Sequence, residues 1–358
     1  MRILIVSNLY PDSRQPAFGT FVAAHAGALR RAGADVAVVA ISGVPVHEAV
    51  IRKYLSLMIR AITYAVWARI RHEAPSVVEA HVAYPTALMA WITARLAGAS
   101  VVVYCHGSDV TGVAARSRVH NFVARWLFAR ADLVVPNSAY IRNLLEAQYA
   151  VPPAKLSLLP PGVDLTLFSG ASSRRRVGEI LYVGRLARGK GVHELLQAVV
   201  GLGDRKVSLR FVGDGPERSA LQQTAAAARI ETTFHGAMAP AEVAGLMRVA
   251  SVVAMPSTHP EGLGLVALEA MAAGALVVAT AAGGIAESVI DGETGWLVPP
   301  GDVPALSAAL RKALMTAAAA DQAPRVAMQE RAMAKAREHD IDAIARRTLA
   351  VYGSLGTR

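Results

Sequence analysis

The sequence predicts an α/β protein with two domains, each built on a parallel β-sheet. Three observations lead to this prediction. The chain has 358 residues, which is more than one ordinary hydrophobic core needs. Hydrophobic residues make up 53% and charged residues 18%, so a large core is available and disorder is not expected. Short apolar, β-branched runs alternate with Ala-rich segments of helical spacing, which is typical of alternating strands and helices.

The first half of the chain begins with a strand–helix–strand unit. Ile3–Ser7 is an apolar strand, Thr20–Gly33 has helical spacing and stops at a glycine, and Asp35–Ala40 is the next strand. Further strands, covered on both faces, are expected at Val77–Ala80, Val101–Tyr104 and Leu133–Pro136. Polar or Gly-containing loops follow them at His81–Pro85, His106–Asp109 and Asn137–Ser138. We expect a Rossmann-like domain over residues 1–168.

A change of composition then separates the two halves. Leu159–Asp164 is rich in Pro and Gly, and Ser169–Arg176 is polar and basic, as linkers often are. A second Rossmann-like domain is expected over residues 169–335. Its expected strands are Glu179–Val183, Ser208–Val212, Thr232–Phe234, Val252–Met255 and Leu276–Ala279. One Ala- and Arg-rich helix is expected from about Gln322 to Tyr352, with residues 336–358 as a separate C-terminal segment.

Charge and cysteine usage narrow the possible partners and the compartment. The formal net charge is +10 and the pI is about 10.0, which favours anionic partners such as nucleotide sugars, lipid pyrophosphates or phospholipid head groups. Nucleic acid is disfavoured, because basic residues are not interleaved with exposed aromatics and no nucleic-acid motif is present. The single cysteine, Cys105, fits a reducing compartment, so a cytoplasmic location is expected. No signal peptide or transmembrane stretch is recognisable.

Two glutamates, Glu261 and Glu269, are separated by seven residues in a segment that runs from a loop into a helix. The loop follows the apolar run Ser251–Met255, so Glu261 is expected at the carboxyl edge of a sheet, where open α/β sheets bind ligands. Gly262 and Gly264 permit close approach of the backbone, and the helix start through Leu263 and Leu265 presents N–H groups that favour an anion. The segment predicts a site for a ligand with phosphate and hydroxyl groups.

This segment resembles the E-x7-E motif of retaining glycosyltransferases of the GT4-like group. The resemblance continues through Glu269–Gly274, Val277–Thr280, Gly283–Gly284, Glu287 and Asp291–Gly295. It implies a GT-B fold, in which two Rossmann-like domains face each other across a cleft and the C-terminal helix crosses back to the first domain. It also implies that Glu261 holds the transferred sugar and that Glu269 binds the donor ribose.

The loop Gly184–Gly191 follows the first strand of the second half. It carries Arg185 and Lys190, two charges suited to a departing diphosphate, and it resembles the family's G-R-L-x-x-x-K-G motif. A basic surface turn is the plainer interpretation. The loop lacks G-x-G-x-x-G, so a nicotinamide-dependent oxidoreductase has no support here.

Three further glycine-containing turns are assigned to the donor by resemblance. Gly213 lies in the turn Gly213–Glu217, near the expected base-binding region, and His235 with Gly236 would pack against the base. Gly19 opens a helix whose amide end would meet the donor phosphate or sugar. An ordinary turn at Gly213 and a capping glycine at Gly19 remain open alternatives.

His106 and Asp109 form a His-Gly-Ser-Asp loop after an expected strand. The loop resembles the family's H-G-x-D motif, which implies that His106 stabilises the reacting sugar through its ring or backbone carbonyl. Asp109 would orient the loop or bind the acceptor. A Cys105–His106 nucleophile pair is not expected, because neighbours on a strand point to opposite faces.

No metal and no cofactor are expected besides the nucleotide-sugar co-substrate. Asp340–Asp342 resembles a D-x-D metal motif only superficially, because residues two apart diverge on a helix. The resemblance implies a glycan or glycolipid acceptor, which the region 42–73 does not identify. Ile51–Arg71 carries five basic residues and no acidic ones, so it is expected either to dock on an anionic inner membrane surface or to be an ordinary basic helix.

The expected activity is therefore retaining glycosyl transfer, with the leaving phosphate acting as base in a front-face attack. Two alternatives stay open: a nucleotide-sugar epimerase of the same architecture, and a non-catalytic module that binds sugar nucleotides.

Overall fold

The computed structural model describes residues 1–13, 15–41, 50–112, 117–170, 175–204 and 206–355. Contacts divide the chain into two compact units. The first comprises Met1–Gly162 and Ile341–Arg358, and the second comprises Val163–Asp340. Parts of the expected linker (171–174) and of the region between 42 and 73 (42–49) lie outside the described residues.

The first unit has a five-stranded parallel sheet with the order β2-β1-β3-β4-β5. Its strands are β1 (Arg2–Ser7), β2 (Asp35–Ala40), β3 (Val77–His81), β4 (Ser100–Cys105) and β5 (Leu133–Pro136). Its helices are α1 (Thr20–Arg31), α2 (Val50–Ile70), α3 (Thr86–Ala97), α4 (Ser108–Thr111), α6 (Arg118–Arg130), α7 (Ala139–Tyr149), the 3-10 turn η2 (Pro153–Lys155) and α16 (Ile341–Gly353). All five expected strands are present.

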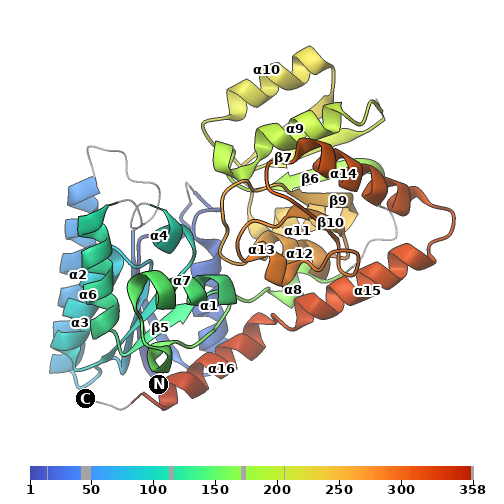
Figure 1. Cartoon of the computed structure of the whole chain (residues 1–358). Coiled ribbons are helices and arrows are strands. Elements are labelled where there is room, and N and C mark those ends of the chain that lie inside the picture. Colours follow the sequence, from blue (N-terminus) through green and yellow to red (C-terminus); the bar gives the residue numbers. More distant parts are fainter. Residues whose placement is uncertain (14, 42–49, 113–116, 171–174, 205, 356–358) are drawn as a thin grey trace. The chain divides into compact units, whose positions relative to one another are not determined.

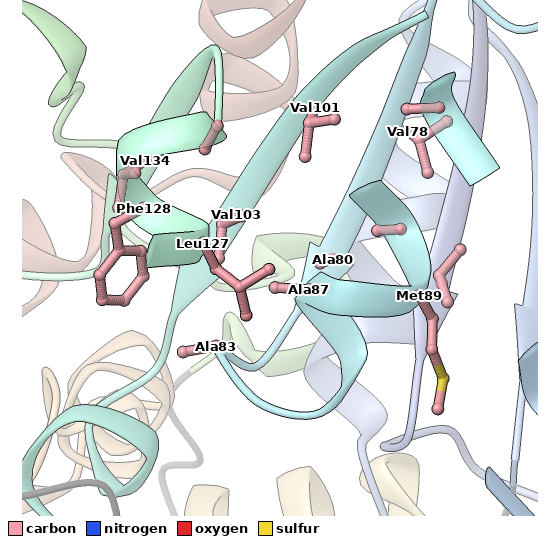
Figure 2. Packing of buried hydrophobic residues seen from close by; sticks show 14 of the residues in the cluster. Val78, Ala80, Ala83, Ala87, Met89, Val101, Val103, Leu127, Phe128 and Val134 are labelled. Atoms are coloured by element: carbon pink, nitrogen blue, oxygen red, sulfur yellow. The ribbon is translucent and has the colours of Figure 1, made fainter. Parts of the chain in front are cut away.

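Alternate residues of these strands enter two separate hydrophobic layers. On one face, Val78 and Val103 belong to a hydrophobic cluster that also contains Leu127 and Phe128 of α6 and residues of helix α3, as Figure 2 shows. On the other face, the strands contact α1 and the C-terminal α16. Figure 1 shows α2, α3 and α6 side by side on the first of these faces. Burial on both faces explains why the strands are continuous apolar runs.

The second unit has a six-stranded parallel sheet with the order β11-β10-β9-β6-β7-β8. Its strands are β6 (Arg176–Val183), β7 (Ser208–Val212), β8 (Glu231–Gly236), β9 (Ala250–Met255), β10 (Leu276–Thr280) and β11 (Trp296–Val298). Its helices are α8 (Leu165–Phe168), η3 (Arg188–Lys190), α9 (Val192–Val200), α10 (Arg218–Ala228), α11 (Pro240–Val249), α12 (Leu265–Ala272), α13 (Ile285–Ser288), α14 (Val303–Ala318) and α15 (Ala323–Arg337). Strand β11 was not predicted from the sequence, because it has only three residues.

The boundaries between the units fall at different residues from those expected. Residues 163–168 belong to the second unit, because Asp164 caps the short helix α8 and Phe168 is buried in that unit's core. The expected single helix from Gln322 to Tyr352 is wrong. It is two helices, α15 and α16, with a break where the carbonyl of His339 accepts a hydrogen bond from the N–H of Val163 at 2.8 Å.

No helix within the described ranges is long and apolar enough to span a bilayer.

Candidate functional site

Three loops meet at the carboxyl edge of the second unit's sheet, after β6, β7 and β9. A Cβ atom on Gly213 would lie 1.9 Å from the carbonyl oxygen of Gly184, and a Cβ on Gly191 would lie 1.8 Å from the carbonyl oxygen of Pro256. Gly213 and Gly191 also have positive φ. Only glycine fits at these two positions, because the loop backbones touch there. The predicted motif residues therefore come together at one edge of the sheet.

Lys190 and Glu261 are in direct contact at this edge. The Lys190 Nζ donates to Oε1 of Glu261 at 2.6 Å, and the Ser257 hydroxyl donates to the same oxygen at 2.7 Å. The Lys190 side chain remains 38% exposed and that of Glu261 18% exposed. The two groups are neighbours rather than opposite walls of a site, so a bound anion can compete with Glu261 for the lysine.

The loop that carries Glu261 is fixed to the turn after β10. The N–H of Glu261 donates to the carbonyl of Ala282 at 3.2 Å, and the N–H of Gly284 donates to the carbonyl of Glu261 at 2.9 Å. The Thr280 hydroxyl donates to the carbonyl of Ser257 at 2.5 Å. Because backbone groups on both sides of the carboxylate are held, its position is set before any ligand binds.

Helix α12 begins directly after this loop. Its N-cap, Gly264, has φ 83°, and no side chain caps the first turn. Gly262 and Leu263 are buried, while Leu265 starts the helix. The first N–H groups of a helix have no partner within the helix and carry partial positive charge. This helix start can therefore receive an anionic group or a carbonyl oxygen.

Glu269 lies one turn further along α12. Its side chain is only partly exposed, and burial raises the pKa of its carboxyl to about 8. It accepts no hydrogen bond from a side chain within the described ranges. At neutral pH a large fraction of this group is a neutral acid, which can both donate and accept hydrogen bonds. A ligand with hydroxyl groups would suit it.

Arg185 is exposed, and its guanidinium has no ion-pair partner among the described residues. Its carbonyl accepts a hydrogen bond from the hydroxyl of Tyr182 at 2.8 Å. Burial, with a further contribution from the charge of Glu261, raises the pKa of the Tyr182 phenol. Tyr182 thus connects the Arg185 loop to the surroundings of Glu261, while the Arg185 side chain is left available.

His235 lies at a β-bulge where β8 leaves register with β7. Its Nε2 is 3.5 Å from a guanidinium nitrogen of Arg210, which also pairs with Glu179 at 2.6 Å. The following residue, Gly236, accepts a hydrogen bond from the N–H of Gly213 at 2.7 Å. Backbone next to His235 is therefore joined to the Gly213 turn, whereas the imidazole lies near an ion pair of the sheet. The base-binding role stays a prediction.

In the first unit, Gly19 is the N-cap of α1 and has φ 67°. A Cβ at this position would lie 2.4 Å from the carbonyl carbon of Leu9, so the preceding loop passes directly over the helix start. Both expected roles, capping and ligand contact, need a glycine here. The assignment to the donor stays a prediction.

Asp109 fixes the loop that carries His106. Its Oδ1 accepts from the N–H groups of His106 at 3.0 Å and Gly107 at 2.9 Å, and its Oδ2 accepts from the N–H of Ala83 at 3.1 Å. Burial nevertheless raises the pKa of the Asp109 carboxyl. Since both oxygens are used by the backbone, the geometry favours the loop-orienting role over acceptor binding.

His106 is held by residues that the sequence analysis did not single out. The amide of Asn137 donates to the carbonyl of His106 at 2.9 Å, and the His81 Nδ1 lies 3.1 Å from the His106 Nε2. His81 is the last residue of β3 and Asn137 directly follows β5, and each begins a segment that was expected to be a polar loop. Ser257, which donates to Glu261, lies two residues after the end of β9, in the loop that leads to Glu261. In the sequence, the signal that could have identified these residues is a polar side chain at or just after the end of an apolar strand.

Among the residues that the structure describes, one group of side chains has the composition of a metal site: His25, Glu79 and His81, whose donor atoms lie within 4.8 Å of one another. The His–Glu distances are 3.1 Å and 3.2 Å, which are ordinary hydrogen bonds that account for the cluster. Metal independence stays a prediction. In the D-x-D segment, Asp342 accepts from Arg31 at 2.9 and 2.7 Å, so that carboxylate is paired within the first unit.

The chain is similar to known glycosyltransferases in sequence and in fold. It is 35% identical to a glycogen synthase of Mycobacterium tuberculosis over 230 residues, 63% of this chain and 55% of that protein. It is 26% identical to a putative teichuronic acid biosynthesis glycosyltransferase, TuaC, of Bacillus subtilis, over 87% of this chain and 89% of that one. The chain spans about half the length of the first curated relatives it matches.

Among solved structures, Anabaena Alr3699/HepE, in complex with UDP and glucose, matches with a TM-score of 0.79 and 22% identity, covering 99% of this chain and 100% of that chain. A likeness of this kind shows the fold, so the chain has the α/β architecture of GT-B glycosyltransferases.

Two family models match the two halves of the sequence. Residues 18–167 match Glycosyltransferase Family 4, and residues 172–333 match Glycosyl transferases group 1. The chain therefore belongs to the glycosyltransferase family that these two models describe, as its E-x7-E segment indicated.

Proposed function

We propose that the protein is a retaining glycosyltransferase that moves a sugar from a nucleotide-diphosphate sugar to a glycan or glycolipid acceptor. The observation that carries the proposal is the Lys190–Glu261 pair beside the uncapped start of α12. A cation, a fixed carboxylate and free backbone N–H groups at one edge of the sheet suit a sugar attached to a diphosphate. Family membership of both halves supports the same reaction class.

Each group has a separate role in this proposal. The diphosphate replaces Glu261 as the partner of Lys190, and Arg185 and the α12 amides add positive charge where negative charge grows on the leaving group. Glu261, released from the lysine, takes a hydroxyl of the transferred sugar. The protein's own cations neutralise the leaving group, so the reaction needs no metal. No carboxylate is assigned as a nucleophile, and the departing phosphate acts as base in a front-face attack.

The donor nucleotide is proposed to be a uridine diphosphate. The support is the likeness to Alr3699/HepE, which was solved with UDP and glucose. Glu269 would meet the ribose, because a partly buried carboxyl with no partner gains most from two neighbouring hydroxyl groups.

The acceptor is proposed to be a cell-envelope polysaccharide or glycolipid reached at the cytoplasmic face of a membrane. Helix α2 carries an exposed apolar stripe, with Ile51 83% and Ile70 75% exposed and Leu55 and Ile59 between them. Lys53, Arg60 and Arg71 lie on an adjacent stripe of the same stretch. Exposed apolar and basic stripes side by side suit an anionic lipid surface. Co-sedimentation with vesicles of anionic and of neutral phospholipid tests this: binding to neither contradicts it.

Thermal-shift measurements with UDP-, GDP- and ADP-sugars test the donor, since a bound donor raises the melting temperature. Transfer is then assayed with the donor that binds, with and without excess EDTA. We expect stabilisation by a UDP-sugar, transfer to an oligosaccharide or lipid acceptor, and full activity in EDTA. Stabilisation by none of the sugars contradicts the donor site, and release of a free sugar without acceptor indicates an epimerase or hydrolase. Loss of activity in EDTA, restored by Mg²⁺ or Mn²⁺, contradicts metal independence.

A further inference from the structure

A buried polar network lies behind His106 in the first unit. At its centre is Glu79 of β3, whose side chain has no exposed surface. Its Oε1 accepts from the hydroxyl of Tyr352 in α16 at 2.8 Å. Its Oε2 lies 3.1 Å from His25 Nε2 and 3.2 Å from His81 Nε2. One neighbour on the same strand, His81, and two residues distant in sequence, His25 and Tyr352, thus supply hydrogen bonds to one carboxylate.

The direction of each hydrogen bond in this network follows from Glu79. Burial alone would raise the pKa of Glu79, but His25 and His81 outweigh it and lower the pKa to about 2. The group is therefore a carboxylate, which only accepts. His81 must donate from Nε2. Burial lowers the pKa of His81, so the ring is neutral at ordinary pH and its Nδ1 carries no proton.

His106 is the next ring in the chain. Its Nε2 lies 3.1 Å from the bare Nδ1 of His81, so the hydrogen must sit on the His106 Nε2. Burial, with contributions from His81 and His25, holds the pKa of His106 well below its ordinary value. His106 is then a neutral imidazole with the proton on Nε2 and a lone pair on Nδ1.

The other polar groups of His106 are already engaged. Its N–H donates to Asp109 at 3.0 Å, and its carbonyl accepts from Asn137 at 2.9 Å. Its Nδ1 has no partner among the described residues, and the residue is partly exposed. By elimination, Nδ1 is the atom of His106 that is free to meet a ligand, and it can only accept.

We propose that Glu79 and His81 are positioning residues that hold His106 as the Nε2–H tautomer, so that Nδ1 accepts a hydrogen bond from a hydroxyl group of the bound sugar. This inference rests on the proposed function in taking the ligand to be a sugar. The tautomer itself follows from the network alone. Glu79 acts through His81 and does not touch the ligand.

The first test measures the tautomer of His106 in the unaltered protein by ¹⁵N NMR of the histidine rings, with the signals assigned from a His106→Gln sample. We expect Nδ1 to give the shift of an unprotonated, pyridine-like nitrogen and Nε2 that of a protonated one, throughout the neutral pH range. A proton on Nδ1, or a doubly protonated ring at pH 7, overturns the proposal. The tautomer is read from the unaltered protein, with His106→Gln used for assignment alone, and the measurement needs no enzymatic activity.

The second test is Glu79→Gln, which keeps the shape but lets the side-chain amide donate to His81 Nε2. The His81 proton then moves to Nδ1, and His106 is driven toward the Nδ1–H tautomer, a donor in place of an acceptor. We expect kcat to fall at least about tenfold with KM changed less than about threefold. Wild-type tautomer and wild-type kcat in a folded Glu79→Gln protein overturn the positioning role.

Tyr149→Phe is the matched control, because it also removes a buried hydroxyl hydrogen bond in the first unit, to the carbonyl of Val110 at 2.8 Å, but outside the network. It should lower stability without changing the His106 tautomer or kcat. A similar loss of kcat in this control would show that the Glu79→Gln effect is only structural, which overturns the proposal. If no donor sugar is turned over by any protein, the proposed function fails, and the NMR result still decides the tautomer.

Discussion

Two buried or partly buried glutamates, one in each unit, have opposite electrostatic surroundings. Glu79 in the first unit receives three hydrogen bonds, and its pKa is lowered to about 2. Glu269 in the second unit receives none from the described residues, and burial raises its pKa to about 8. The first carboxyl is fully satisfied within the protein, whereas the second is costly to ionise until a partner arrives. The difference separates a carboxyl that supports the structure from one that is kept for a ligand.

Glu261 receives two hydrogen bonds, fewer than Glu79 and more than Glu269. Lys190 and Ser257 both donate to one of its oxygens. Glu261→Gln keeps the size of the side chain but removes the charge that holds Lys190. We expect transfer to fall on the order of a hundredfold to a thousandfold, as when a fixed charge-stabilising group is removed from an active site. The melting temperature should change little. Lys190→Met should give a similar loss, and steady-state kinetics of both variants checks this. Wild-type turnover by either variant would remove that residue from the proposed site.

Glu79 should instead govern stability, with a defined dependence on pH. Its folded-state pKa of about 2 lies below the ordinary value of 4.5, so its stabilisation is complete above about pH 4.5 and is lost as pH falls toward 2. The shift corresponds to about 3 kcal/mol. Urea unfolding at pH 7 and pH 3 should show a large deficit for Glu79→Gln at pH 7 that shrinks at pH 3. An equal deficit at both pH values contradicts the assignment.

The sequence predicted much of the scaffold and of the second unit's site. Apolar β-branched runs located ten of the eleven strands in the described part of the chain, and glycine-rich turns after them located Lys190, Glu261 and the start of α12. The Glu79 network was not predictable in this way. Glu79 lies inside a strand, and the alternation of side chains along a strand does not show which residues hydrogen-bond to it. One of these residues, Tyr352, is 273 residues away in the sequence. The break at His339 was also hidden, because it depends on a backbone hydrogen bond to Val163.

Glu269→Gln should increase the free energy of unfolding, whereas Glu79→Gln should decrease it. The raised pKa means that Glu269 costs folding free energy as pH rises from 4.5 toward 8, and the amide removes that cost. We expect the variant to be more stable at pH 8 by on the order of 1 kcal/mol, allowing for the partial exposure of the side chain. Donor affinity should fall about tenfold, the equivalent of about 1.4 kcal/mol. Chemical denaturation and calorimetry measure the two effects. A variant that is less stable at pH 8 contradicts the comparison.

Ser257→Ala should have the smallest effect. It removes one of the two hydrogen bonds to the Glu261 oxygen but leaves the lysine in place. The loss should be about threefold to tenfold in kcat/KM, in line with the net value of about 1 kcal/mol for one ordinary hydrogen bond, because Lys190 still holds the oxygen. Ser257→Thr, which keeps the hydroxyl, is the matched variant and should retain more activity. A loss as large as that of Glu261→Gln would mean that Ser257 has a separate role.

We propose that Glu269 is a largely neutral acid near pH 7 and that a bound nucleotide sugar converts it to a hydrogen-bonded carboxylate. Hydroxyl groups that donate to a carboxylate lower its pKa, so donor binding near pH 7 should release protons. Isothermal titration calorimetry of the donor in buffers of different ionisation enthalpy measures this release. We predict a net release that disappears in Glu269→Gln. Binding without proton exchange in the unaltered protein, or the same release from the variant, would contradict the account.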